Sequence, residues 1–274
     1  MFAPTVFAVA AAVLHAAWNL IAKRAVDPFL ALWGQFAVAG AICLPFLIAA
    51  GGLPPAGWAW AGLTGLIHLP YVVGLAHAYR RGDFSLAYPV ARGGGALVAA
   101  VGGVALLGDR LGAWGVVAVV SVACGLCALA IGAPRQQVSA AAAVALTIGA
   151  YTTVDSHAAR QFDGVAYVFA VFVTIGTAVT LWGLATGRGA ALLRLGADSW
   201  RRTGIAAVMS VVTYGLVLLA VRDAPVGYVA ALRESSVLLA AVIGWTVLGE
   251  ERTAGRIGAS VLVVAGLILL VAGR

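Results

Sequence analysis

Runs of about twenty consecutive apolar residues recur from one end of the chain to the other, and they constrain the fold more than any other feature. Of the 274 residues, 63% are hydrophobic and only 10% are charged. A helix of about twenty residues, rising 1.5 Å per residue, crosses the roughly 30 Å hydrocarbon layer of a bilayer. A soluble core does not need so many such runs, so the sequence predicts one membrane domain that occupies the whole chain.

The apolar runs are continuous rather than alternating with a period of two, which favours transmembrane helices over strands. The predicted fold class is therefore all-α and polytopic. Breaks at charged residues, Gly and Pro divide the chain into ten expected transmembrane helices, near 4–23, 30–50, 58–79, 84–107, 113–132, 138–160, 165–186, 204–221, 226–248 and 257–273. The polar connection 187–203 is expected to lie along the membrane surface as a loop or a short amphipathic turn.

The sequence also matches itself at an offset of 141 residues. The offset pairs three helices of each half without a gap and superimposes arginines and glycines as well as apolar residues, among them Arg81 with Arg222, Arg92 with Arg233, and Gly103 with Gly244. We therefore predict two five-helix repeats, residues 1–133 and 134–274. An odd number of helices per repeat places the two halves in opposite orientations, which is the inverted-repeat plan of many secondary transporters.

One expected helix, Tyr228 to Gly249, carries adjacent charges at Arg233 and Glu234. A charged side chain at bilayer depth costs at least about 2.5 to 3.5 kcal/mol, so it normally faces a bundle interior or a wet cavity. Arg92 and Arg233 each lie about 10 Å inside their helices and approach from opposite faces of the membrane. The two arginines are therefore expected to straddle the midplane, where transporters of this plan bind their substrates.

Arg233 is the first candidate for binding a solute, because its planar guanidinium can hold a carboxylate or phosphonate through two parallel hydrogen bonds. The alternative is an internal ion pair. Glu234 is a candidate for a coupling proton, because a carboxyl group removed from water takes up a proton more readily. Its competing role is that of counter-ion to Arg92 or Arg233. Adjacent helical residues point about 100° apart, so Arg233 and Glu234 are each expected to need another partner.

Two other expected helices carry polar residues on one face. In the sixth, Tyr151 and Asp155 offer a hydroxyl and a carboxylate suited to an ammonium group, and Asp155 is a second candidate for coupling. In the first, His15 and Asn19 lie four residues apart with Trp18 beside them, a trio suited to hydrogen-bonding a ligand; His15 is a third candidate for coupling. Either set can instead hold neighbouring helices together.

Three further residues complete the predicted substrate site. Ser236 lies on a stripe of small residues that begins at Arg233, which either allows close helix packing or leaves room for a ligand. Tyr88 and Tyr214 are weaker candidates inside the expected fourth and eighth helices. No cluster with metal-ligand spacing and no nucleophile motif is readable, so neither a cofactor nor an enzymatic activity is expected.

The whole chain resembles the drug/metabolite transporter superfamily, specifically its EamA-type permeases. The fourth helix of each half ends in Leu107-Gly108-Asp109-Arg110 or Leu248-Gly249-Glu250-Glu251, and a Gly-rich fifth helix follows. The segments LHAAWNLIAK, AYTTVDSHAAR and VAALRESSVLLAA are similar to one bacterial subgroup. The first half departs from the family pattern in having Asp109 where Glu is usual. The resemblance implies ten helices, a central cavity lined mainly by helices 1, 3, 4, 6, 8 and 9, and alternating access.

Together these observations predict a secondary transporter of a small anionic or zwitterionic metabolite in the bacterial inner membrane, with proton coupling. An uncoupled facilitator and a flippase for a lipid-linked solute remain alternatives. The expected partners are the solute and the lipid bilayer. Nucleic acid is not expected despite the net charge of +7, because the basic residues lie singly or in pairs between apolar runs. The charge count between runs places both termini outside, whereas the resemblance implies termini inside.

Overall fold

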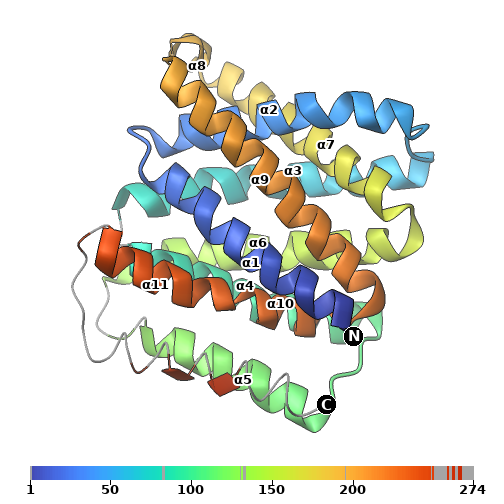
Figure 1. Ribbon diagram of the computed structural model, residues 1–274, viewed down its shortest axis with the longest axis vertical. Helices are drawn as coiled ribbons and strands as arrows, with labels where there is room; N and C mark the ends of the chain where they lie inside the picture. Colours follow the sequence, from blue (N-terminus) through green and yellow to red (C-terminus); the bar gives the residue numbers. More distant parts are fainter. Residues whose placement is uncertain are drawn as a thin grey trace.

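The computed structural model describes residues 2–81, 84–129, 131, 134–194, 196–247, 249, 258, 261–262 and 265–266, and every regular element among them is a helix (Figure 1). The all-α class is confirmed. The helices are α1 (Phe2–Lys23), α2 (Pro28–Ala49), α3 (Pro55–Arg81), α4 (Phe84–Leu107), α5 (Ala113–Leu129), α6 (Arg135–Gln161), α7 (Gly164–Ala185), α8 (Gly189–Leu193), α9 (Ala197–Asp223), α10 (Val226–Arg233) and α11 (Ser235–Val247).

Seven of these helices, namely α1, α2, α3, α4, α6, α7 and α9, are long and apolar enough to cross a membrane. The multi-pass prediction is therefore supported. The expected fifth helix corresponds to α5, which is shorter, and the expected ninth is divided into α10 and α11. The expected tenth helix, 257–273, lies outside the described residues except for a few isolated positions.

Two boundaries differ from those expected from the sequence. α9 begins at Ala197 rather than near 204, because the polar stretch before it continues the helix, and the remaining connection contains the short α8. The division between α10 and α11 falls at Glu234, whose backbone N–H donates to the carbonyl of Ala231, three residues back, at 3.0 Å. A bond to the third residue back tightens one turn of the helix at a charged residue.

The crossing of α2 and α7 is reciprocal. A Cβ added to Gly40 would lie 2.9 Å from the carbonyl oxygen of Phe172, and one added to Gly176 would lie 2.7 Å from the carbonyl oxygen of Phe36. Both approaches are too close for any side chain, so the glycines allow the two backbones to touch. Each residue in one half of this contact is 136 positions from its counterpart in the other half, and a reciprocal contact is what a two-fold relation between the halves produces.

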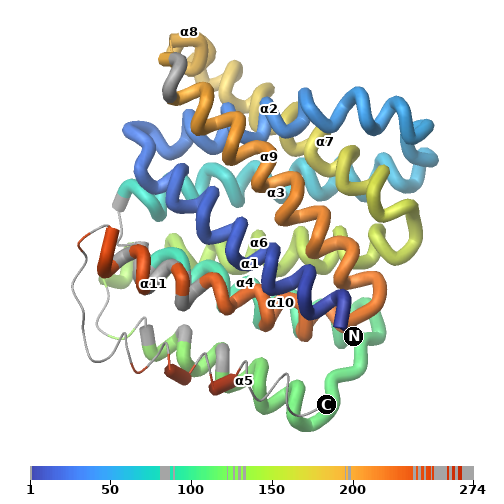
Figure 2. Tube along the Cα trace, in the orientation of Figure 1, coloured from blue at the N-terminus to red at the C-terminus, as the bar shows by residue number. Residues whose placement is uncertain are grey.

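The same spacing of 136 relates the starts of the two helices. Asp27 caps α2 by accepting hydrogen bonds from the backbone of the first turn, and Asp163 caps α7 in the same way. The packing of the longer helices is also matched, since α3 lies against α6 and α7 while α9 lies against α1 and α2. Figure 2 shows α1 and α9 crossing the bundle side by side, with α4, α10 and α11 beneath them in this view.

Candidate functional site

A small cavity lies at the centre of the bundle, where α1, α2, α3, α6, α7, α9 and α10 meet. Its volume is about 30 Å³, which is room for one or two water molecules and far less than the roughly 300 Å³ of a typical ligand site. The helices must therefore separate before a metabolite can enter. The lining residues are His15, Trp18, Phe36, His68, Tyr71, Tyr151, Phe172, Ile175, Ser210, Thr213, Tyr214 and Arg233.

A buried ion pair lies beside this cavity and joins the two halves of the chain. The guanidinium of Arg92 on α4 donates to the carboxylate of Glu234 at 3.0 Å, and the side chains are only 5% and 1% exposed. On the same pair of helices the Tyr88 hydroxyl donates to Ser236 at 3.0 Å. The pairing gives Glu234 the separate partner that its position on the helix requires, and that partner is Arg92 rather than its neighbour Arg233.

Arg233 is consequently left with its charge directed to the cavity. Its side chain is 2% exposed, and it makes no hydrogen bond or ion pair with the part of the chain that the structure describes. Its Nε is a buried donor without a partner. Burying an unpaired charge is costly, and such a group in a native fold calls for an explanation, such as an anion that occupies the cavity in part of the functional cycle.

Two further unpaired polar atoms belong to residues that line the cavity with Arg233. The indole Nε1 of Trp18 on α1 and the hydroxyl of Thr213 on α9 are both buried and have no hydrogen-bond partner among the described residues. Indole can only donate, and a Thr hydroxyl can donate or accept. Three helices thus present donors to one small space, which suits a ligand that offers several hydrogen-bond acceptors.

The remaining cavity wall is largely aromatic. The His68 ring on α3 stacks on the Tyr151 ring on α6 with centroids 4.0 Å apart, and Tyr71 and Tyr214 meet the Tyr151 ring edge to face. Such contacts hold flat side chains in defined positions. His68 lies two residues before Pro70, and α3 continues through this proline.

Asp155 and Asn19 do not line the cavity, although both were expected to face a ligand. The carboxylate of Asp155 is fully buried and accepts hydrogen bonds from the hydroxyls of Thr64, Tyr167 and Tyr214, which come from three different helices. The amide oxygen of Asn19 accepts from the Tyr79 hydroxyl at 2.5 Å. Both side chains therefore hold helices together, which is the alternative role considered for them. Asp155 reaches the cavity only through Tyr214.

The structure thus divides the predicted site residues into two layers. His15, Trp18, Tyr151, Tyr214 and Arg233 line the cavity. The others form contacts behind them, namely Asn19, Tyr88, Arg92, Asp155, Glu234 and Ser236.

Sequence reasoning missed several lining residues, chiefly Phe36, Tyr71, Phe172, Ser210 and Thr213. Phe36 and Phe172 carried the only available signal, because they occupy equivalent places in the two halves at the spacing of 136 residues. That spacing differs from the 141 that the sequence comparison detected. Tyr71, Ser210 and Thr213 resemble many other residues of apolar helices, and only packing separates them from the rest.

A second ion pair closes one end of the bundle. Arg160, at the end of α6, binds both carboxylate oxygens of Asp109 at 2.8 and 3.3 Å and also donates to the carbonyls of Val221 and Ala224. Asp109 in turn accepts from the backbone N–H of Val226 at 2.7 Å. The family-type motif after α4 therefore ties α6 to the link between α9 and α10.

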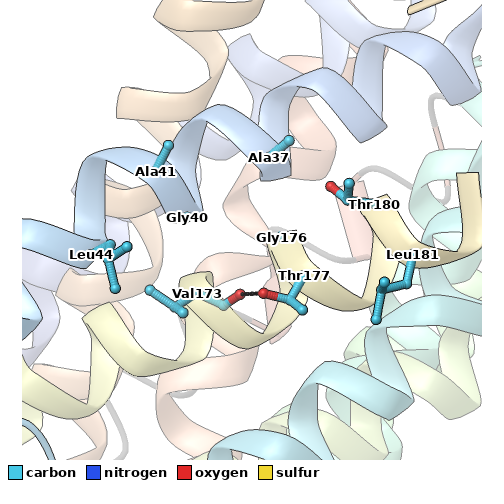
Figure 3. Close-up of a pocket in the computed structure, with 9 residues that line it drawn as sticks. All are labelled: Ala37, Gly40, Ala41, Leu44, Val173, Gly176, Thr177, Thr180 and Leu181. Atoms are coloured by element: carbon cyan, nitrogen blue, oxygen red, sulfur yellow. Dashed lines mark hydrogen bonds between the residues drawn. The ribbon is translucent and has the colours of Figure 1, made fainter. Parts of the chain in front are cut away.

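A larger groove of about 300 Å³ opens on the outer surface between α2 and α7 (Figure 3). Its lining is mostly small and apolar, and its hydroxyls are already occupied. Thr177 donates to the carbonyl of Val173 at 2.8 Å, and Thr180 accepts from Trp33 at 3.1 Å. With no free polar group on its lining side chains, the groove suits a lipid chain rather than a polar solute, and we place the candidate site at the smaller central cavity.

Comparison with known proteins adds to this geometry. The sequence model of the EamA-like transporter family matches residues 136–272. No curated protein matches the chain. A solved structure, described only as a crystal structure of a protein, aligns with a TM-score of 0.69 over 97% of this chain and 95% of the other, at 19% identity. Similarity at that identity shows a shared fold and no more. The family match covers half of the chain, and the chain belongs to the EamA-like transporter family.

Proposed function

We propose that this protein is a secondary transporter that moves a small anionic or zwitterionic metabolite across the bacterial inner membrane by alternating access. The observation that carries the proposal is Arg233, a buried guanidinium that lines the central cavity without a counter-ion among the described residues. Arg92 has its own partner in Glu234, so the group of three charges beside the cavity has a net charge of +1. An anionic group next to Arg233 would balance it.

We further propose that the chain is built from two inverted five-helix repeats, residues 1–133 and 134–274. Support comes from the reciprocal contact of Gly40 and Gly176, from the matching caps Asp27 and Asp163, and from the matched packing of α3 and α9. The first two helices of each repeat correspond at a spacing of 136 and the later ones at 141, so a five-residue difference in length separates them. Inverted repeats around a central site are the usual basis of alternating access.

Proton coupling is proposed at Glu234. If this carboxyl takes up a proton, Arg92 loses its partner and the region beside the cavity becomes more positive, which favours an anionic solute. Proton and solute would then each increase the affinity for the other, as thermodynamic linkage requires. His15 lines the same cavity and is a second group whose protonation would add positive charge. Asp155 is a less direct candidate, because three hydroxyls already occupy its carboxylate.

The transport proposal is tested by counterflow of pooled metabolites into liposomes that contain the purified protein. We expect accumulation of a solute with a carboxylate, phosphonate or phosphate group. Arg233→Lys is expected to fold but to weaken binding by about 30-fold, because a point charge does not reproduce the planar fork of donors. Normal binding of cationic amines by both proteins, with no anion bound, would show that Arg233 is structural.

Coupling is tested separately by applying a pH gradient to the same liposomes and then collapsing it. Coupled transport is expected to accelerate with the inward gradient and to slow when the gradient is lost, and Glu234→Gln is expected to remove this response. Uptake that ignores the gradient would favour the uncoupled facilitator.

A flippase is a second candidate because open apolar grooves flank α7. One lies against α2, and another of about 570 Å³ lies against α3. Neither groove has a charged residue in its lining, so neither offers a polar path for a lipid headgroup. We therefore prefer the polar solute. Movement of a fluorescent lipid between the leaflets of the same liposomes would reverse that preference.

A further inference from the structure

A second pocket lies at the end of the bundle, between the end of α1, the turn into α2 and the start of α9. Its volume is about 230 Å³, and it shares no lining residue with the central cavity. In Figure 1 this end of the bundle is where the orange α9 begins next to α8. The pocket is therefore separate from the proposed transport site, and a ligand bound in it need not be the transported solute.

Two arginines from different helices line this pocket. Arg202 on α9 makes no hydrogen bond or ion pair with any residue that the structure describes. Arg24, just after α1, donates one bond of 3.3 Å to the carbonyl of Val247, which leaves most of its guanidinium N–H groups for another acceptor. Two guanidinium groups thus meet at one opening without a shared anion.

The acidic residue in the pocket, Asp27, is already fully engaged. It caps α2 by accepting from the backbone of Phe29 and Leu30 at 2.9 and 3.2 Å, and it forms an ion pair with Arg188. Arg188 is held in place by the Phe29 ring, whose centroid is 4.9 Å from the guanidinium carbon. Asp27 is therefore balanced by Arg188, and the charges of Arg24 and Arg202 remain.

The other lining groups are suited to a phosphate on an apolar body. Ser199 and Thr203 lie three residues before and one after Arg202, so α9 presents two hydroxyls to the same pocket as its arginine. Ile21 and Leu30 supply an apolar wall, and Val26 beside them is fully exposed. A fully exposed valine in a turn between two membrane helices is consistent with contact with lipid.

The geometry points to a binding site for the phosphate of an anionic phospholipid headgroup, held by Arg24 and Arg202 with the hydroxyls of Ser199 and Thr203. Guanidinium groups bind phosphate oxygens through paired, charge-assisted hydrogen bonds. Basic pockets between membrane helices are known to hold lipid headgroups. We assign the lipid rather than free phosphate because the pocket lies at the ends of three membrane helices and has an apolar wall for the glycerol and acyl chains.

The test is native mass spectrometry of the full-length protein in detergent, titrated with phosphatidylglycerol, phosphatidylcholine or inorganic phosphate. We expect selective retention of phosphatidylglycerol. The double variant Arg24→Gln/Arg202→Gln is expected to bind it about 10- to 30-fold more weakly, from roughly fivefold for each arginine. Arg202→Gln alone removes no contact within the described protein, so its expected fourfold to fivefold loss does not depend on a change in folding.

The matched control is Arg194→Gln/Arg201→Gln, which removes the same charge from exposed arginines near this end that do not line the pocket. It is expected to bind phosphatidylglycerol within about twofold of the unmodified protein. An equal loss in the control would mean general attraction to a basic surface and would overturn the site. Equal retention of phosphatidylcholine, or saturation by inorganic phosphate at the same concentration, would overturn the assignment to an anionic lipid.

Discussion

The helix α4 and the pair α10–α11 occupy equivalent places in the two halves of the chain, yet they perform different tasks at the same three positions. After Arg92 the first half has Gly93, Gly94 and Gly95, whereas after Arg233 the second half has Glu234, Ser235 and Ser236. The glycines allow α4 to pack closely on α6. A Cβ on Gly95 would lie 2.5 Å from Ile148 and one on Gly94 would lie 2.8 Å from Ala145.

The polar residues of the second half instead reach across to α4. Glu234 binds Arg92, and Ser236 accepts from Tyr88. The reverse ion pair, from the first half to Arg233, cannot form because residue 93 is a glycine and has no side chain. One substitution between the halves thus pairs one arginine and leaves the other for the cavity. A duplicated fold can produce a single charged binding group in this way.

The largest expected effect comes from removing the carboxylate that makes the halves differ. Glu234→Gln should leave Arg92 buried without a counter-ion and destabilise the protein by about 3 to 5 kcal/mol, because an uncompensated buried charge is very costly. The measurement is the thermal unfolding of the purified protein in detergent.

The double variant Arg92→Met/Glu234→Met is the control for that experiment, since it removes both charges. It should recover most of the lost stability, because replacing a whole buried pair by apolar residues is often neutral. A double variant no more stable than Glu234→Gln alone would show that the pair does not account for the effect.

An intermediate effect is expected from making α4 resemble α11. Gly95→Ser introduces the residue found at the equivalent position 236, but its Cβ would overlap Ile148 on α6. Overpacking of this kind costs typically about 1 to 3 kcal/mol. Gly62→Ser in α3, where an added Cβ would meet no atom within 4 Å, is the matched control and should unfold near the temperature of the unmodified protein. If both serines were tolerated equally, close packing of α4 on α6 would not be the role of Gly95.

The smallest effect is expected at Ser236. Ser236→Ala removes the acceptor of the Tyr88 hydroxyl and should cost about 0.5 to 1.5 kcal/mol, the usual contribution of a single hydrogen bond. Tyr88→Phe removes the donor of the same bond, and the two changes combined should cost less than the sum of the separate changes. Strict additivity in thermal unfolding would mean that the two side chains are not coupled.

The sequence alone determined the class of the protein and the residues that had to be buried together. Long apolar runs can be satisfied only by membrane helices, and a charge inside such a run must face the interior, so the central position of Arg92, Arg233 and Glu234 followed from periodicity and from the cost of burying charge. The repeat of the later helices was also visible, because it preserved arginines and glycines at one constant offset. The correspondence of the first two helices was missed because the offset there is 136.

Only the tertiary structure decided which of these groups pair. Helical periodicity fixes the side of a helix on which a residue lies, but not the neighbouring helix that it meets, the distance between them or the other side chains that compete for it. Asp155 illustrates the difference, since the sequence shows a carboxylate on a polar face, while packing brings hydroxyls from α3, α7 and α9 to it. Glu234 is one residue from Arg233 in the chain, yet it binds Arg92, because the crossing of α4 with α10 and α11 brings that guanidinium within hydrogen-bonding distance of its carboxylate.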